Sequence, residues 1–72
     1  MNVTLSEREL SVIRLVAEGK TNEEVGKDLC ISPNTVRAHL VRIGLKLRVH
    51  KRADIVYMAA KKRMLNGSRD VR

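Results

Sequence analysis

The chain has 72 residues, a formal net charge of +7 and a single cysteine. This length suits one domain with a thin core, so helix caps or a partner subunit must add stability. One cysteine excludes an internal disulfide, and the sequence has neither a signal peptide nor an apolar run long enough to cross a membrane. These features favour a protein of the reducing cytoplasm with no membrane partner.

The charge is unevenly distributed along the chain. Residues 1–32 hold four Lys or Arg against six Asp or Glu, whereas residues 33–72 hold eleven against two. Such asymmetry predicts that the second half meets a polyanion. Trp and Phe are absent, which makes an anionic membrane surface the weaker candidate. Nucleic acid is therefore the expected partner, and with double-stranded DNA as that nucleic acid the expected location is a nucleoid-associated place in the cytoplasm.

Two capping boxes predict where the first two helices begin. Ser6 with Glu9 opens the first helix, which ends at Gly19, and Thr21 with Glu24 opens a shorter second one. The apolar residues expected on their buried sides are Leu10, Val12, Ile13, Val16 and Ala17 in the first helix and Val25 and Leu29 in the second.

A third helix is predicted to begin with Ser32 as its N-cap and Pro33 as its first residue. At about 100° per residue, its core stripe is Val36, Leu40, Ile43 and Leu47. The opposite face carries Asn34, Arg37, Ala38, Val41 and Leu45, with Thr35 and Arg42 at its edge. A short helix, a tight turn and a longer helix form a helix-turn-helix pattern, in which Cys30 occupies the turn position that usually favours Gly.

The outer face of this third helix suits a DNA major groove. Arginine reaches guanine edges or phosphates, and small apolar side chains meet thymine methyl groups. The alternative is an ordinary surface helix with scattered apolar residues, which are common on protein surfaces.

The last predicted helix, residues 52–65, carries apolar residues over more than half of its circumference. A single core contact needs a stripe of roughly 100°. The surplus indicates either the same helix of a second subunit or a small domain that wraps this helix unusually fully. Residues 66–72 are expected to form a frayed polar tail.

The order of these residues resembles a known family. The matching segments are Leu5-Ser6-x-Arg8-Glu9, Gly19-Lys20-Thr21-Asn22-x-Glu24-Val25, Leu29-x-Ile31-Ser32-x-x-Thr35-Val36-x-x-His39, Ile43-x-x-Lys46-Leu47-x-Val49 and Arg52. Over about residues 4–65 the chain resembles the LuxR-type (GerE-like) DNA-binding domain of bacterial transcription regulators. The resemblance implies an all-α, four-helix helix-turn-helix domain spanning 1–72, whose third helix enters the major groove and whose fourth forms a dimer contact.

The resemblance also implies roles for individual residues. Bases would be read mainly by Arg37, Ala38 and Val41, beside Asn34 and Arg42 on the same face. Thr35 and Lys46 would hold phosphates, with Lys20 and Asn22 close to the DNA backbone. The dimer contact is expected at Ile55, Met58, Ala59 and Lys62.

Three residues depart from the family pattern. Gly26 stands where Ala is usual, which costs roughly 0.5 to 1 kcal/mol of helix stability. Gly44 interrupts the recognition helix where a larger apolar residue is common, and Lys51 replaces the usual cap of the fourth helix. These changes bear on rigidity and dimer stability rather than on the base-reading face.

Other chemistry is weakly supported by the sequence. Glu9 falls in the apolar sector of the first helix, so beyond capping we expect it to pair with a basic group such as Arg52. His39 is expected to make a structural hydrogen bond, while His50 and Cys30 have no companion at metal-ligand spacing. No catalytic motif is present, so we predict no enzyme, no metal and no cofactor.

The sequence therefore predicts a DNA-binding transcriptional regulator that acts as a dimer on promoter DNA. The alternative is a small interaction protein that forms heterodimers with larger LuxR-type regulators and blocks them. A third hypothesis is an enzyme subunit or a nucleoid-coating protein that binds DNA without reading its sequence.

Overall fold

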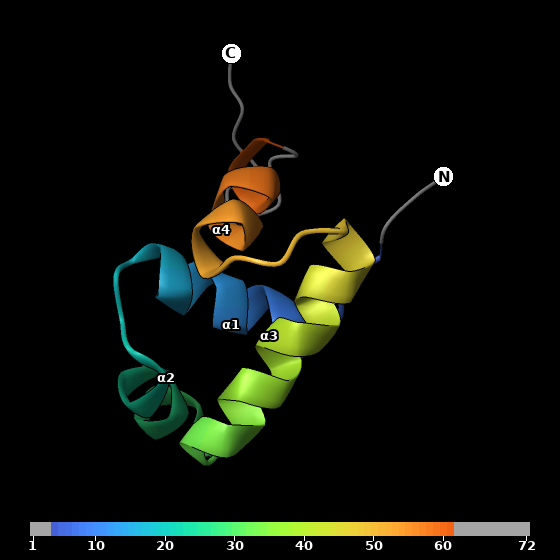
Figure 1. Cartoon of the computed structure of the whole chain (residues 1–72). Helices are drawn as coiled ribbons and strands as arrows, with labels where there is room; N and C mark the ends of the chain where they lie inside the picture. The colour runs from blue at the N-terminus through green and yellow to red at the C-terminus, as the bar shows by residue number, and fades with distance from the viewer. Residues whose placement is uncertain (1–3, 62–72) are drawn as a thin grey trace.

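The computed structural model describes residues 4–61, in which four helices and no strands are found. The helices are α1 (Glu7–Ala17), α2 (Asn22–Leu29), α3 (Pro33–Leu47) and α4 (Arg52–Lys61), shown in Figure 1. The predicted all-α, four-helix class is confirmed. Residues 62–65, expected in the last helix, and the predicted tail 66–72 lie outside the described residues.

The first three helices begin where the sequence places their caps. The Ser6 and Thr21 hydroxyls each accept the backbone N–H three residues on, and the glutamate at that position accepts the N–H of the cap residue in return. In α3, Ser32 Oγ accepts the Thr35 N–H at 3.1 Å, and Pro33 is the first helical residue. Local side-chain chemistry therefore determines these three starting points.

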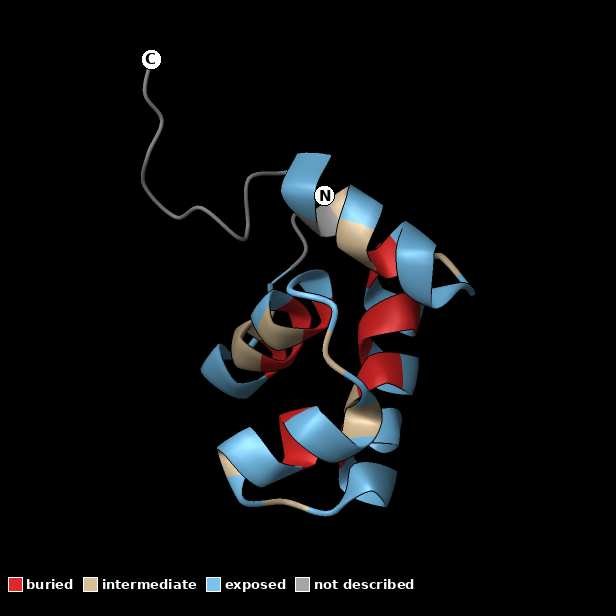
Figure 2. Ribbon diagram, turned by 90° about the vertical axis from the view of Figure 1, so that its left-hand side faces the viewer, coloured by how far each residue is buried: buried red, intermediate tan, exposed pale blue. Residues whose placement is uncertain are grey.

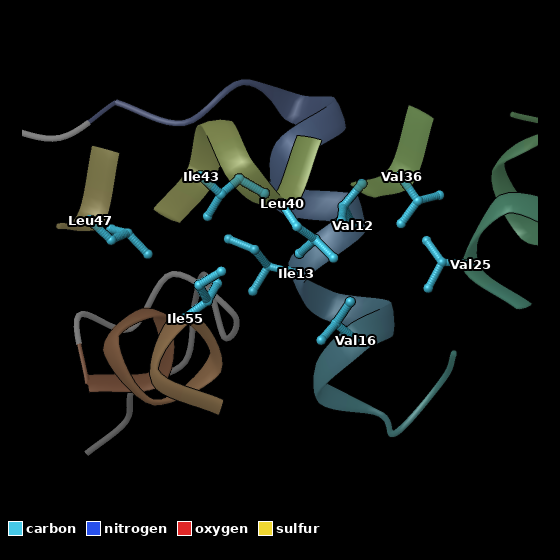
Figure 3. Packing of buried hydrophobic residues seen from close by; sticks show 9 residues of the cluster. All are labelled: Val12, Ile13, Val16, Val25, Val36, Leu40, Ile43, Leu47 and Ile55. Atoms are coloured by element: carbon cyan, nitrogen blue, oxygen red, sulfur yellow. The ribbon is translucent and has the colours of Figure 1, made fainter. Parts of the chain in front are cut away.

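One side of α3 forms the centre of the core (Figure 3). The predicted stripe is buried throughout, and α1, α2 and α4 all pack against this helix. The buried apolar residues are Val12, Ile13, Val16, Val25, Val36, Leu40, Ile43, Leu47 and Ile55. Three predicted core residues differ, because Ala17 is exposed at the end of α1 and Leu10 and Leu29 are only half-buried. Figure 2 shows the buried residues on the inward sides of the helices and the exposed ones on the outward sides.

Helices α2 and α3 end in the same way. Cys30 (φ 61°) and Arg48 (φ 62°) both adopt the left-handed conformation, and each donates its N–H to the carbonyl of the glycine four residues earlier. The next residue's N–H reaches the same glycine carbonyl, from Ile31 to Gly26 and from Val49 to Gly44, at 2.9 Å in both cases. The prediction that Cys30 occupies the turn position suited to Gly is therefore confirmed.

These two helix ends explain the glycines that depart from the family pattern. A Cβ on Gly26 would lie 2.5 Å from the Ile31 carbonyl oxygen, and one on Gly44 would lie 2.9 Å from that of Val49. Both distances are too short for a real methyl group, so the chain turns back against the glycine in each helix. The low helix propensity of Gly26 is thus offset by the close approach that it permits.

We expect Cys30→Gly and Arg48→Gly each to raise the free energy of unfolding by about 0.5 to 1 kcal/mol. The left-handed conformation costs a residue with a Cβ about 1 to 2 kcal/mol, and glycine avoids this cost. Part of the resulting stabilisation is lost again, because glycine has more conformational entropy in the unfolded chain. Thermal or urea denaturation of each variant measures the effect. Cys30→Ala is the control, since it removes the thiol and keeps the strain. A Cys30→Gly variant no more stable than Cys30→Ala would contradict the prediction.

Candidate nucleic-acid interface

The outward face of α3 is exposed as the sequence predicts. Arg37, Ala38 and Arg42 are exposed, and Val41 and Leu45 keep 58% and 74% of their surface accessible. This helix contains no acidic residue. A row of accessible aliphatic side chains flanked by guanidinium groups can offer both methyl contacts and hydrogen-bond donors to a ligand.

The N-terminus of α3 places hydroxyl groups at one end of this face. Ser32 Oγ and Thr35 Oγ1 lie 3.0 Å apart, and both residues are exposed. Asn34 is also exposed beside them. Because Ser32 Oγ already accepts the Thr35 N–H, the capping contact restrains the position of the Thr35 hydroxyl at the edge of the helix.

Lys46 lies on the side of α3 that faces α1, and it has partners inside the domain. Its Nζ donates to Glu9 Oε1 at 2.8 Å and to the Thr4 carbonyl at 3.2 Å. The Glu9 side chain is 3% exposed and the Lys46 side chain 37% exposed. Burial alone would raise the pKa of Glu9, but the hydrogen bonds from Lys46 and Ser6 outweigh it and lower that pKa. The prediction that Glu9 pairs with a basic group is therefore confirmed, but its suggested partner Arg52 is wrong, because the cation is Lys46.

Arg52 instead joins the start of α4 to the start of α2. Its guanidinium donates to Asn22 Oδ1 at 2.6 Å and to the Lys20 carbonyl at 2.7 Å. Lys20 Nζ pairs with Asp28 at 3.1 Å, and this hydrogen bond raises the pKa of Lys20. Asn22 and Lys20, both predicted near the DNA backbone, thus lie together at the start of α2 with polar partners in the domain.

The predicted dimer surface is only partly available. Ile55 is 3% exposed and belongs to the domain's own core, so the expectation that it faces a second subunit is wrong. Met58 is half-buried against the same core, whereas Tyr57 beside it is 62% exposed. The Ala59 side chain and all of Lys62 lie outside what the structure describes. For Ile55, the alternative that the small domain wraps its last helix holds.

His39 differs from its expected role. Its Nδ1 is buried and has no hydrogen-bond partner among the residues that the structure describes, so the predicted structural bond is not found at that atom. Within residues 4–61, no group of three His, Cys, Asp or Glu side chains is placed to hold a metal ion. None of the helices in that range is long and apolar enough to span a membrane.

Lys46→Met should lower the free energy of unfolding by about 1 to 3 kcal/mol, because it leaves the buried Glu9 carboxylate without its cation. The exposed Lys27→Met is the matched control and should change stability little. The lowered pKa of Glu9 adds a pH dependence. Its stabilising contribution is complete above the ordinary glutamate value of 4.5 and is lost as the pH falls through the folded pKa.

Urea denaturation between pH 7 and pH 3 measures both effects. Glu9→Gln should lack this component of the acid loss, since it cannot titrate. Equal stability of Lys46→Met and wild type at pH 7 would show that the ion pair contributes nothing to the fold.

Comparison with known proteins agrees with this architecture. Residues 3–59 match the family model described as bacterial regulatory proteins, luxR family. The chain is 40% identical over 63 residues to the transcriptional regulatory protein LiaR of Bacillus subtilis, covering 88% of this chain and 30% of that protein. It is 39% identical over 62 residues to the oxygen regulatory protein NreC of Staphylococcus carnosus, covering 86% of this chain and 29% of that protein.

A solved structure shows the same arrangement of helices. The crystal structure of the response regulator ChrA, of a heme-sensing two-component system, superposes with a TM-score of 0.83 at 33% identity. The match covers 89% of this chain and 32% of that one, so the chain spans about a third of these relatives. The chain belongs to the luxR family of bacterial regulatory proteins and has its helix-turn-helix, DNA-binding type of domain.

Proposed function

We propose that this chain regulates transcription by binding promoter DNA sequence-specifically, with α3 in the major groove. The observation that carries the proposal is the outward face of α3, where Arg37, Ala38 and Val41 are exposed on a helix without acidic residues. An α-helix fits the major groove, in which each base pair presents a distinct pattern of donors, acceptors and methyl groups. Family membership and the regulator relatives LiaR and NreC support this function.

Within this proposal, the side chains on the exposed face of α3 have different roles, according to the groups that they offer to DNA. Arg37 offers paired donors to guanine, and Ala38 and Val41 offer methyl groups to thymine. Asn34 and Arg42, on the same exposed face, reach neighbouring base edges or phosphates. Thr35, Lys46, Lys20 and Asn22 lie toward the DNA backbone, where hydroxyl, ammonium and amide groups bind phosphate oxygens. The excess of positive charge after residue 32 attracts the duplex at long range.

Arg37→Ala should weaken binding to the preferred site by about 1 to 3 kcal/mol and relax specificity at one base pair. Ala38→Glu should abolish binding while leaving the fold intact, because residue 38 is exposed and a carboxylate there would meet base edges and phosphates. The preferred site comes from selection of bound duplexes from a random pool. Titration of a panel of single-base variants of that site then measures each mutant.

Arg14→Ala is the control for the loss of one positive charge, since Arg14 is exposed on α1. An equal loss of affinity on all sequences for Arg37→Ala would make Arg37 a phosphate contact only. Full affinity of Ala38→Glu would exclude α3 as the docking face.

We further propose that two chains bind a palindromic site through the exposed part of α4. Tyr57 is 62% exposed on this helix and Met58 is half-buried beside it, so both keep some accessible surface after the core is formed. A two-fold pair would present two α3 helices to half-sites about one helical turn apart. The contact is a single short helix, so self-association should be weak in solution and stronger on DNA, where both chains share one duplex. The same patch would serve a heterodimer with a larger regulator of the family.

Met58→Glu should reduce cooperative binding to the full palindrome and change the affinity for an isolated half-site much less. The cause is a carboxylate placed in the apolar contact between the two α4 helices. Ala17→Glu, an exposed apolar position on α1, introduces the same charge as a control. Half-site and full-site titrations with sedimentation measure the effect, and circular dichroism checks the fold. Independent filling of two half-sites by the wild-type chain would contradict this mode of dimerisation.

A further inference from the structure

The Lys46 ammonium occupies a position that is both part of the domain and close to its DNA face. At about 100° per residue, Thr35, Arg42 and Lys46 share one side of α3. Two hydrogen bonds hold Lys46 Nζ against the N-terminus of α1, at 2.8 Å from Glu9 Oε1 and 3.2 Å from the Thr4 carbonyl. A lysine ammonium carries three N–H donors, so one remains for an outside acceptor. The side chain is 37% exposed, which leaves that donor accessible.

Glu9 gives this ammonium an unusual environment. Its carboxylate is 3% exposed, and the same Oε1 that accepts from Lys46 also accepts the Ser6 N–H at 2.9 Å. The carboxylate is therefore held by the capping box and cannot turn away from Lys46 without breaking the cap. In contrast, Arg37 and Arg42 are exposed and make no ion pair with other residues in the range 4–61.

We propose that Glu9 is a positioning residue for DNA binding, which anchors the Lys46 ammonium at the edge of α3 and offsets its charge. Lys46 then gives a phosphate one directed hydrogen bond with little net release of counterions. The salt-dependent attraction comes instead from unpaired cations such as Arg37 and Arg42. The inference rests on the proposed function, because it specifies how one residue of the DNA interface works.

One consequence of the Glu9–Lys46 pair is a lower affinity of the chain for DNA of any sequence. Each phosphate charge that a protein cation neutralises releases a counterion and so increases the affinity for any duplex. The slope of log K against log salt concentration measures the number of those phosphates. An ammonium already paired with a carboxylate adds close to zero to that count. Glu9 therefore lowers affinity for random DNA without touching a base.

The test is the salt dependence of binding of the full chain to a random-sequence duplex of about 20 base pairs. Glu9→Gln keeps an oxygen that can accept the Ser6 N–H and Lys46, but it removes the negative charge. We expect the slope to become steeper by about one unit and the affinity near 0.1 M salt to rise about fivefold. Glu7→Gln, two residues away and exposed, makes the same charge change and should alter the slope by much less than a unit.

A purely structural role for Glu9 would weaken binding or leave it unchanged, and it would not steepen the slope. An unchanged slope for folded Glu9→Gln would therefore overturn the inference. A slope change of equal size in Glu7→Gln would also overturn it, since the effect would then come from net charge alone.

A double variant keeps the test decisive if Glu9→Gln fails to fold. Glu9→Gln/Lys46→Met removes both charges together and leaves no buried carboxylate unpaired. The affinity should fall, because a phosphate hydrogen bond is lost, while the slope stays within about 0.3 unit of wild type. A slope shallower by about one unit would show that Lys46 acts as an unshielded phosphate contact and would overturn the inference. If the wild-type chain binds no duplex at all, the proposed function itself fails, which is a distinct outcome.

Discussion

The packing of one side of α3 against the three other helices is the constraint on which the rest of the structure depends. Ile43 and Val36 are fully buried on this side, and they belong to one core cluster with Ile13, which is fully buried in α1. Since the buried stripe occupies only one side of the helix, the opposite side is left to solvent or to a ligand. Among residues 4–61, no further helix lies over that side. The exposed face of α3 is thus the direct result of a thin core.

With so little apolar surface to bury, the domain relies on its helix ends. Each of the first three helices begins with a side-chain cap, which replaces hydrogen bonds that the first turn otherwise lacks. Two helices end on a residue in the left-handed conformation. Four residues before each of them, a glycine without a side chain allows the following backbone to approach the helix closely. At the end of α2 this close approach keeps the turn to α3 short, so α3 is oriented by backbone contacts as well as by its core side.

Polar contacts between distant residues then connect the elements that the core leaves at the edge. Arg52 joins α4 to the start of α2, and Lys46 joins α3 to the start of α1. From composition alone, both cations would be expected to bind an external polyanion. In the structure, each has hydrogen-bond partners within the domain. Net charge therefore overstates the number of cations that are free of partners within the domain, since Lys20 and Lys46 both form ion pairs.

The sequence by itself determined where the first three helices begin and which side of α3 is buried. Capping boxes, the Ser32-Pro33 start and the helical period depend on residues within a few positions of one another, so they can be inferred without the fold. The tertiary structure decided what depends on distant partners. Glu9 and Lys46 are 37 residues apart in the chain, so spacing could show that the carboxylate was buried but not which cation reaches it. Likewise, periodicity showed a surplus of apolar residues on α4, but only packing against α3 and α1 could assign Ile55 to the core. Long-range pairing and burial are properties of the assembled helices, and a local pattern carries no information on which surfaces will meet.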